Sequence, residues 1–219
     1  MSQQPAVYAP RHVVILAHPD PHSFNALVAD TYCATVRERG QEAIVRDLYA
    51  LGFDPILKDA ERPHDQGFTL ADDVAAELRI IDGSDAFVFV YPIWFGMPPA
   101  MMKGYVDRVL GAGVKVRQVQ ERSAKTLMRD KRLLSITSSG ASKTWLSQQD
   151  QMDSLRNVFG RYLLHAFGLK AFENLHFGET IDGLPPEFVD ANLRQVTSHA
   201  AAMCDALIAD AVPAQLAPA

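Results

Sequence analysis

Residues 87–110 read FVFVYPIWFGMPPAMMKGYVDRVL and decide the fold class. The first five are apolar, as expected of a strand that is covered on both faces of a sheet. Pro92 then ends the strand, and the pair Trp94 and Phe95 follows before Gly96 and two prolines redirect the backbone into a helix. Because open α/β sheets bind ligands at the carboxyl ends of their strands, we expect a flat, apolar ligand that stacks on these rings.

Strands and helices alternate along the rest of the chain. Short apolar or edge-type runs predict four further strands, at 13–17, 43–47, 133–136 and 171–175. Apolar residues spaced by three and four predict helices at 24–36, 74–81, 102–109, 152–166 and 189–207. Ser23 is expected to cap the first helix, and Gly40 suits its C-terminal end.

This alternation predicts an α/β fold with right-handed crossovers and helices on both faces of a parallel sheet. Three apolar strands between polar edges at 43–47 and 171–175 fit a flavodoxin-like three-layer αβα sandwich, with a five-stranded parallel sheet in the order 2-1-3-4-5. A six-stranded Rossmann sheet is the competing topology. It is disfavoured because the first turn, 18–25, reads HPDPHSFN and lacks the G-x-G-x-x-G pattern.

Composition limits the class of protein. We expect a single domain in 219 residues, with tails at 1–10 and 212–219. A net charge of -5 with scattered Lys and Arg argues against a nucleic-acid partner. No apolar run approaches the roughly 18 residues of a membrane span, and the start lacks signal-peptide order, so we expect a cytoplasmic protein. Cys33 and Cys204 lie in helix-like patterns and are interpreted as ordinary thiols.

The three loops that follow the central strands have binding character. The helix that begins near Ser23 offers free backbone N–H groups and a positive dipole end to an anion, and His18 adds a donor, although both also suit an ordinary capped turn. His18 and His22 do not form a recognised metal-ligand pattern, so no metal is predicted. Hydroxyls and N–H groups at 137–140 suit the polar edge of a heterocycle, or simply a polar turn. The aromatic pair at 94–95 suits either stacking on a ligand ring or packing in the hydrophobic core.

Four motifs, taken together and in order, resemble those of one family. They are LAHPDPHSFN at 16–25, RDLYALGFDPIL at 46–57, YPIWFGMPPAMMKGYVDRVL at 91–110 and LLSITSSG at 133–140. Over 13–175 the chain resembles the flavodoxin-like NAD(P)H:quinone oxidoreductases of the DT-diaphorase type and their bacterial relatives.

The resemblance implies a flavin along the carboxyl edge of the sheet, with FAD slightly favoured over FMN. It implies that NAD(P)H gives a hydride to the flavin and that a quinone or similar acceptor then takes two electrons, in ping-pong order, within a homodimer. The implied cofactor-binding residues are His18, Ser23, Phe24 and Asn25 for the phosphates, Pro92, Ile93, Trp94 and Phe95 for the ring face, and Thr137, Ser138, Ser139 and Gly140 for its polar edge.

The chain departs from the family at two catalytic positions. Where known members place a tyrosine and a histidine, counting from Thr137 gives Trp145 and Gln151. We take these two as the catalytic candidates, although neither side chain is a useful proton carrier near neutral pH. The flavin is still expected to be reduced.

Other interpretations stay open. Some relatives are regulatory subunits of potassium-efflux transporters, and true flavodoxins are one-electron carriers, although their T/S-x-T-G loop is absent here. The basic segment 115–130 is interpreted as a solvated loop, with a site cover, a subunit contact or an NADPH phosphate site as alternatives.

Overall fold

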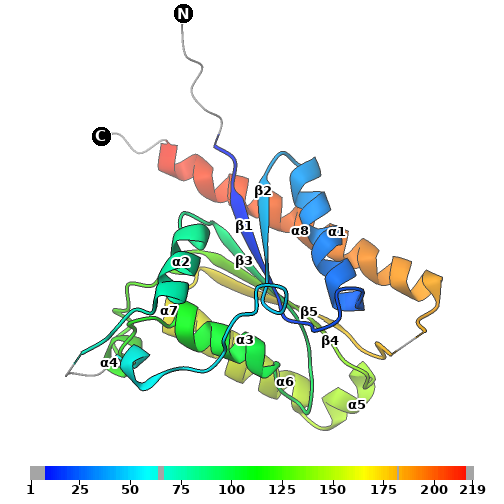
Figure 1. The fold of residues 1–219 in the computed structure, drawn as a ribbon. Coiled ribbons are helices and arrows are strands. Elements are labelled where there is room, and N and C mark those ends of the chain that lie inside the picture. Colours follow the sequence, from blue (N-terminus) through cyan, green and yellow to red (C-terminus); the bar gives the residue numbers. More distant parts are fainter. Residues whose placement is uncertain (1–7, 64–66, 182, 216–219) are drawn as a thin grey trace, which may run out of the picture.

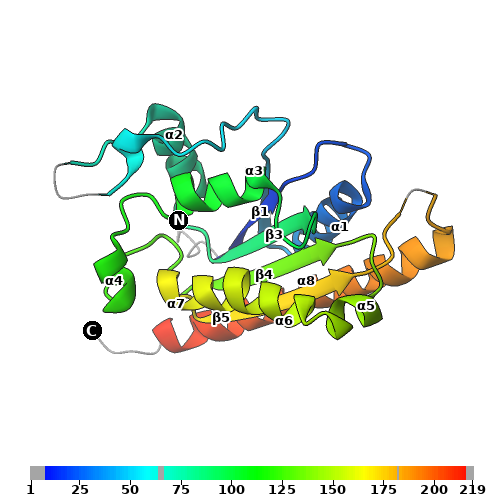
Figure 2. The ribbon, with the colours of Figure 1, turned by 90° about the horizontal axis from the view of Figure 1, so that it is seen from below.

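The sheet has the topology that the sequence predicts. In the computed structural model, which describes residues 8–63, 67–181 and 183–215, five parallel strands are ordered β2-β1-β3-β4-β5. Figures 1 and 2 show them running in one direction. The flavodoxin-like αβα sandwich is therefore confirmed, with the polar strands at its edges. The strands are β1 Arg11–Leu16, β2 Glu42–Asp47, β3 Ala86–Pro92, β4 Arg132–Ser138 and β5 Ala171–Phe177.

Helices cover both faces of this sheet. α1 and α8 lie on one face, and α2, α3, α6 and α7 lie on the other (Figure 1). The helices are α1 Phe24–Glu38, α2 Asp72–Ile81, α3 Ala100–Tyr105, α4 Val116–Gln120, α5 Lys143–Gln148, α6 Gln151–Leu155, α7 Tyr162–Phe167 and α8 Pro186–Gln215, with a 3₁₀ turn η1 at Asp59–Glu61 and π-helical segments η2 Val106–Leu110 and η3 Arg156–Arg161.

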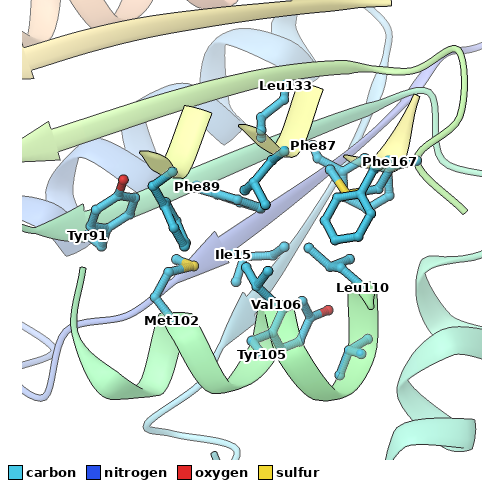
Figure 3. Packing of buried hydrophobic residues seen from close by; sticks show 14 of the residues in the cluster. Ile15, Phe87, Phe89, Tyr91, Met102, Tyr105, Val106, Leu110, Leu133 and Phe167 are labelled. Carbon is cyan, nitrogen blue, oxygen red and sulfur yellow. The ribbon is translucent and has the colours of Figure 1, made fainter. Parts of the chain in front are cut away.

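Strand β3 divides its side chains between two cores. All seven of its residues are buried. Because side chains alternate across a strand, Phe87, Phe89 and Tyr91 face the α3 side, where they pack with Ile15 and Met102 (Figure 3). Its valines face α1 and α8 instead. The large rings thus fill one layer, and β-branched side chains fill the other.

Several element boundaries differ from the prediction. The helices expected at 102–109 and 152–166 each contain a π-helical segment, which a single apolar period does not reveal. α8 continues to Gln215, so residues 212–215 of the tail predicted at 212–219 are helical. The remaining tail residues, 216–219 and 1–7, lie outside the described residues. α4 and α5 were missed because five or six residues carry too little periodicity.

The segment 115–130 is not simply a solvated loop. It contains α4, and its Met128 is fully buried in the core on the α3 side. Ala124 is buried as well. The Arg129 guanidinium donates to the carbonyl of Ala124 at 2.6 Å and to that of Arg122 at 3.1 Å. The charges that suggested solvation are therefore partly used to hold the segment against the domain.

A buried ion cluster fastens the β2–α2 connection to η2. Arg108 donates from Nε and Nη2 to the Glu61 carboxylate, at 3.0 and 2.8 Å. It also reaches Asp73 at 2.9 Å and the carbonyl of Asp54. The Arg108 side chain is only 3% exposed. Close by, Gly104 packs so tightly on Pro55 that a Cβ there would lie 2.3 Å from its carbonyl oxygen.

Candidate functional site

A cavity of about 360 Å³ lies at the carboxyl ends of β1, β3 and β4. Its walls come from the β1–α1 loop, the residues after β3, the loop after β4 and the loop after β5. Most of the cofactor-binding residues predicted from the sequence line it. They are His18, Ser23, Phe24, Asn25, Pro92, Ile93, Trp94, Ser138, Ser139 and Gly140.

The amino end of α1 opens into the cavity. Ser23 is the predicted N-cap, and its Oγ accepts from the Ala26 N–H at 3.2 Å. The first N–H groups of a helix have no intrahelical acceptor, and together with the helix dipole they favour an anion. α1 has 15 residues and carries no acidic side chain in its first turn to compete for them. This end of the cavity therefore suits a phosphate group.

His18 lies beside this helix end and lines the cavity. Its Nδ1 lies 3.1 Å from the Asp20 backbone nitrogen and 3.2 Å from the Asp20 carbonyl oxygen. Either ring nitrogen can therefore carry the proton of the neutral imidazole. The imidazole is also tilted against Trp94, with ring centroids 5.8 Å apart. The predicted anion donor and the predicted stacking residue are thus neighbours.

A buried hydrogen bond ties two walls together. Asn25 in the first turn of α1 donates from Nδ2 to Ser138 Oγ at 2.9 Å, and both residues are almost fully buried. This bond joins the β1–α1 wall to the end of β4.

The aromatic pair sits on a tight turn. Trp94 and Met97 exchange both backbone hydrogen bonds at 3.1 Å, and Phe95 and Gly96 have φ of 50° and 77°. These are the features of a type I′ turn, in which a phenylalanine with positive φ is strained. Trp94 lines the cavity, but Phe95 is fully exposed and does not line it.

The two catalytic candidates are placed differently. Gln151, the first residue of α6, donates from Nε2 to the Gly96 carbonyl at 3.0 Å and so contacts the aromatic turn. Trp145 lies on α5 with half of its surface exposed, and it lines no part of the cavity. Gln151 does not line the cavity either, so its link to the site is only through the turn that carries Trp94.

Thr137 also lies outside the cavity. It is one residue before Ser138 on β4, so its side chain faces the opposite side of the sheet. Its hydroxyl lies 2.9 Å from Nδ1 of His176, a buried residue of β5 that the sequence analysis missed. The His176 Nε2 lies 3.1 Å from Ser139 Oγ. Burial lowers the pKa of His176 to about 4, with help from the Lys143 charge, so the ring is neutral at pH 7.

The loop after β5 completes the cavity and was also missed. Thr180, Ile181, Gly183 and Leu184 line its outer part, beside Val189 of α8. The sequence could have indicated this loop, because it follows the fifth predicted strand. Ligands bind at the carboxyl ends of the strands in open α/β sheets, and this applies to the fifth strand as well. Among the described residues no helix is long and apolar enough to cross a membrane. The described part of the chain also holds no cluster of three or more His, Cys, Asp or Glu that could bind a metal.

The two buried histidines predict a loss of stability in mild acid. Burial lowers the pKa of His12 as well as that of His176. In the unfolded chain both titrate near 6.5. Between that value and the folded pKa the unfolded chain binds more protons, so the free energy of unfolding falls as pH falls, by on the order of 1 kcal/mol per pH unit from His176.

Urea denaturation at pH 7, 6 and 5 measures this slope. This range from pH 7 to pH 5 lies above the pH at which carboxylates such as Asp210, with a pKa of about 2, become protonated and cease to stabilise the fold. His176→Gln is expected to flatten the slope. Equal unfolding free energies at pH 7 and pH 5 in the unaltered protein would contradict the expectation.

Comparison with known proteins places the chain in a family. The family described as "Flavodoxin-like fold" matches residues 10–201. The chain therefore belongs to this family. An uncharacterized NAD(P)H oxidoreductase of Haemophilus influenzae is 28% identical over 77% of this chain and 83% of its own length. Rat NAD(P)H dehydrogenase (quinone) 1 is 30% identical over 63% of this chain, but the match spans only 57% of the rat enzyme.

Solved structures agree with this placement. An NAD(P)H:quinone oxidoreductase from Methanothermobacter marburgensis has a TM-score of 0.76 at 25% identity, with 88% of this chain and 95% of that chain covered. An FMN-dependent NADH-azoreductase from Bacillus anthracis, solved with FMN, shares the fold at 18% identity, with a TM-score of 0.64 and coverage of 89% and 99%. The resemblance to flavodoxin-like NAD(P)H:quinone oxidoreductases that the four motifs predict is confirmed by these relatives.

Proposed function

We propose that this protein is a flavin-dependent NAD(P)H oxidoreductase that transfers two electrons to a quinone or similar acceptor. The observation that carries the proposal is the joining of an anion site and a flat aromatic wall in one cavity. The amino end of α1, with His18 beside it, suits the flavin phosphates, and Pro92, Ile93 and Trp94 suit one side of the ring system. Ser139 and Gly140 lie where its polar edge would bond.

The chemistry belongs to the cofactor, and the chain supplies position and polarity. A bound flavin accepts a hydride and passes on two electrons. In this proposal nicotinamide and acceptor would occupy the same place beside the bound flavin in turn, which is ping-pong order. The relatives named as NAD(P)H:quinone oxidoreductases support the choice of donor and acceptor.

Quinone-dependent oxidation of NADH and NADPH tests this function directly. Under anaerobic conditions the flavin-loaded protein is expected to oxidise one or both nucleotides beyond one equivalent per flavin only when a quinone such as benzoquinone is present. Initial rates at several acceptor concentrations should give parallel double-reciprocal lines. Protein that holds flavin in full occupancy but shows no quinone-dependent oxidation would contradict the proposal.

Gln151 and Trp145 form a matched pair for the catalytic question. Gln151→Ala removes the hydrogen bond to the Gly96 carbonyl and is expected to raise KM for the acceptor several-fold, because Trp94 sits on the same turn. Trp145→Ala is expected to change neither kcat nor KM by more than twofold. Steady-state kinetics with two acceptors measures both. Unchanged KM in Gln151→Ala would show that this contact does not position the site.

We propose FAD rather than FMN as the resident flavin. The cavity is also lined by apolar side chains that a phosphate does not need, namely Leu27, Ile181, Leu184 and Val189. Such a surface suits an adenine ring. Ile181→Asp is expected to weaken FAD binding at least tenfold and to leave FMN binding within twofold. Equal losses for the two flavins would argue against an adenine site here.

A second copy of the chain is the proposed partner. An apolar groove of about 650 Å³ between α3, α4 and α7 is lined by Leu57, Met97, Val116, Val158 and Tyr162, all substantially exposed. Exposed apolar surface of this kind marks an interaction site. Met97 also belongs to the aromatic turn, so a homodimer through this face would border the cavity. Sedimentation velocity should show a dimer that Val158→Asp converts to monomer, and a monomeric unaltered protein would contradict it.

The cytoplasmic location of the protein stays a prediction.

A further inference from the structure

A chain of side-chain hydrogen bonds runs beneath the loop after β4. His176 is 5% exposed and contacts two hydroxyls, Thr137 Oγ1 at 2.9 Å from Nδ1 and Ser139 Oγ at 3.1 Å from Nε2. Ser139 Oγ in turn lies 3.0 Å from the carbonyl oxygen of Ala141. No described element other than β4, β5 and this loop takes part. The cluster is separate from the anion site but touches the cavity at Ser139.

The acceptors in this chain fix where each proton lies. The Ala141 carbonyl can only accept, so the Ser139 hydroxyl donates to it. Ser139 Oγ must then accept from His176, which places the imidazole proton on Nε2. Nδ1 is left as an acceptor, so the Thr137 hydroxyl donates to it in preference to the Leu175 carbonyl at 3.4 Å. A single direction of donation therefore runs from Thr137 through His176 and Ser139 to Ala141.

Ser139 is held in place by its backbone as well. Its N–H donates to the Phe177 carbonyl at 2.9 Å, and its carbonyl accepts from the Thr180 N–H at 2.8 Å. With its proton committed to Ala141, the hydroxyl has only a lone pair to offer a ligand. An isoalloxazine ring carries an N–H donor on its polar edge, and an oxygen that can only accept is the complementary partner.

We propose that His176 is a positioning residue for the flavin: as the neutral, Nε2-protonated imidazole it holds Ser139 Oγ as a hydrogen-bond acceptor toward the polar edge of the ring. This inference rests on the proposed flavin site and adds to it a residue that does not line the cavity. It acts only through Ser139, while the Thr137 hydroxyl holds Nδ1 of the imidazole as an acceptor.

The first test is the tautomer, which needs no flavin. Long-range ¹H–¹⁵N NMR of the histidine side chains, assigned by comparison with His176→Gln, should show His176 with an unprotonated Nδ1 and a protonated Nε2 at pH 7. A ring protonated on Nδ1, or on both nitrogens, would overturn the inference.

The second test is flavin affinity in variants with a matched control. His176→Phe fills the same space without donating and is expected to weaken FAD and FMN binding at least tenfold, with a shifted absorption maximum of the bound flavin. His176→Gln keeps a donor toward Ser139 and should restore most of the affinity. His12→Phe is the control, because His12 is also buried and hydrogen-bonded, with Tyr32, Gln41 and Cys204 as partners, but lies in β1 outside the cavity. It should lose stability and keep flavin affinity.

Ser139→Ala tests the same hydrogen bond even if the His176 variants misfold. It leaves the imidazole in place and should weaken flavin binding by a similar factor, and the double variant His176→Phe, Ser139→Ala should lose no more than either alone. Additive losses, or unchanged affinity in folded His176→Phe, would overturn the inference while leaving the proposed function intact. Failure of the unaltered protein to bind any flavin would instead overturn the proposed function, and the tautomer result would then describe a structural bond only.

Discussion

Arg108→Ala is expected to lower the free energy of unfolding by about 3–5 kcal/mol, the usual cost of removing one partner from a buried ion pair. The guanidinium is 3% exposed and neutralises Glu61, which is itself 7% exposed and whose pKa it holds below the ordinary range. Without it, the buried Glu61 carboxylate keeps only the backbone N–H of Lys58 as a donor, and the Asp54 carbonyl loses the Arg108 donor. The connection between β2 and α2 should therefore detach from η2.

Denaturant unfolding followed by circular dichroism measures this loss. Arg117→Ala is the matched control, because Arg117 also pairs with a glutamate, Glu121, at 2.7 Å, but its side chain is 85% exposed. Exposed pairs of this kind contribute roughly 0.5 kcal/mol or less. If Arg108→Ala cost no more than Arg117→Ala, the cluster would not be the fastening that the structure indicates.

The second large effect is expected at Gly140. This residue lines the cavity, and its φ lies outside the left-handed region, so other side chains can adopt its backbone. A Cβ there would lie 3.8 Å from Ile181 Cγ2, an ordinary contact. Gly140→Phe should therefore place a ring in the cavity without straining the chain, and flavin affinity should fall at least a hundredfold, about 2.7 kcal/mol.

Fluorescence titration with FMN and FAD gives both constants. Gly140→Ala is the control and should bind both flavins within a few-fold of the unaltered protein. The unfolding free energies of the two variants should agree within about 1 kcal/mol, since Gly140 is exposed. A Gly140→Phe variant that binds flavin normally would place the ring outside this cavity.

The sheet was predictable because its signals are local. The apolar run of β3 and the polar edges of β2 and β5 give strand type and order, since only edge strands tolerate exposed charge. Pro92 and the aromatic pair after it predicted that the ligand site lies at the carboxyl end of β3. Side chains alternate between the two faces of a strand, so Thr137 and Ser138 face opposite sides of the sheet. The sequence alone could therefore have predicted that Thr137 does not share the ligand site of Ser138.

Other features depend on contacts between distant residues. Arg108 meets Glu61 across 47 positions and Asp73 across 35, and one sequence does not say which charges pair. His176 is an isolated histidine in an edge strand, and only the sheet register, which sets it beside Thr137, gives it partners. The exposure of Phe95 depends on a positive φ that a phenylalanine rarely adopts. These features depend on tertiary structure, and none of the residues concerned lines the cavity.

The visible absorption spectrum of the purified protein is the most direct test of the central claim. It is recorded with and without added FMN or FAD, and then after anaerobic addition of NADH or NADPH. We predict a bound-flavin spectrum that bleaches with at least one nicotinamide. A protein that takes up neither flavin would contradict the account, because the amino end of α1, His18 and Trp94 would then form a cavity without the ligand for which their chemistry is suited.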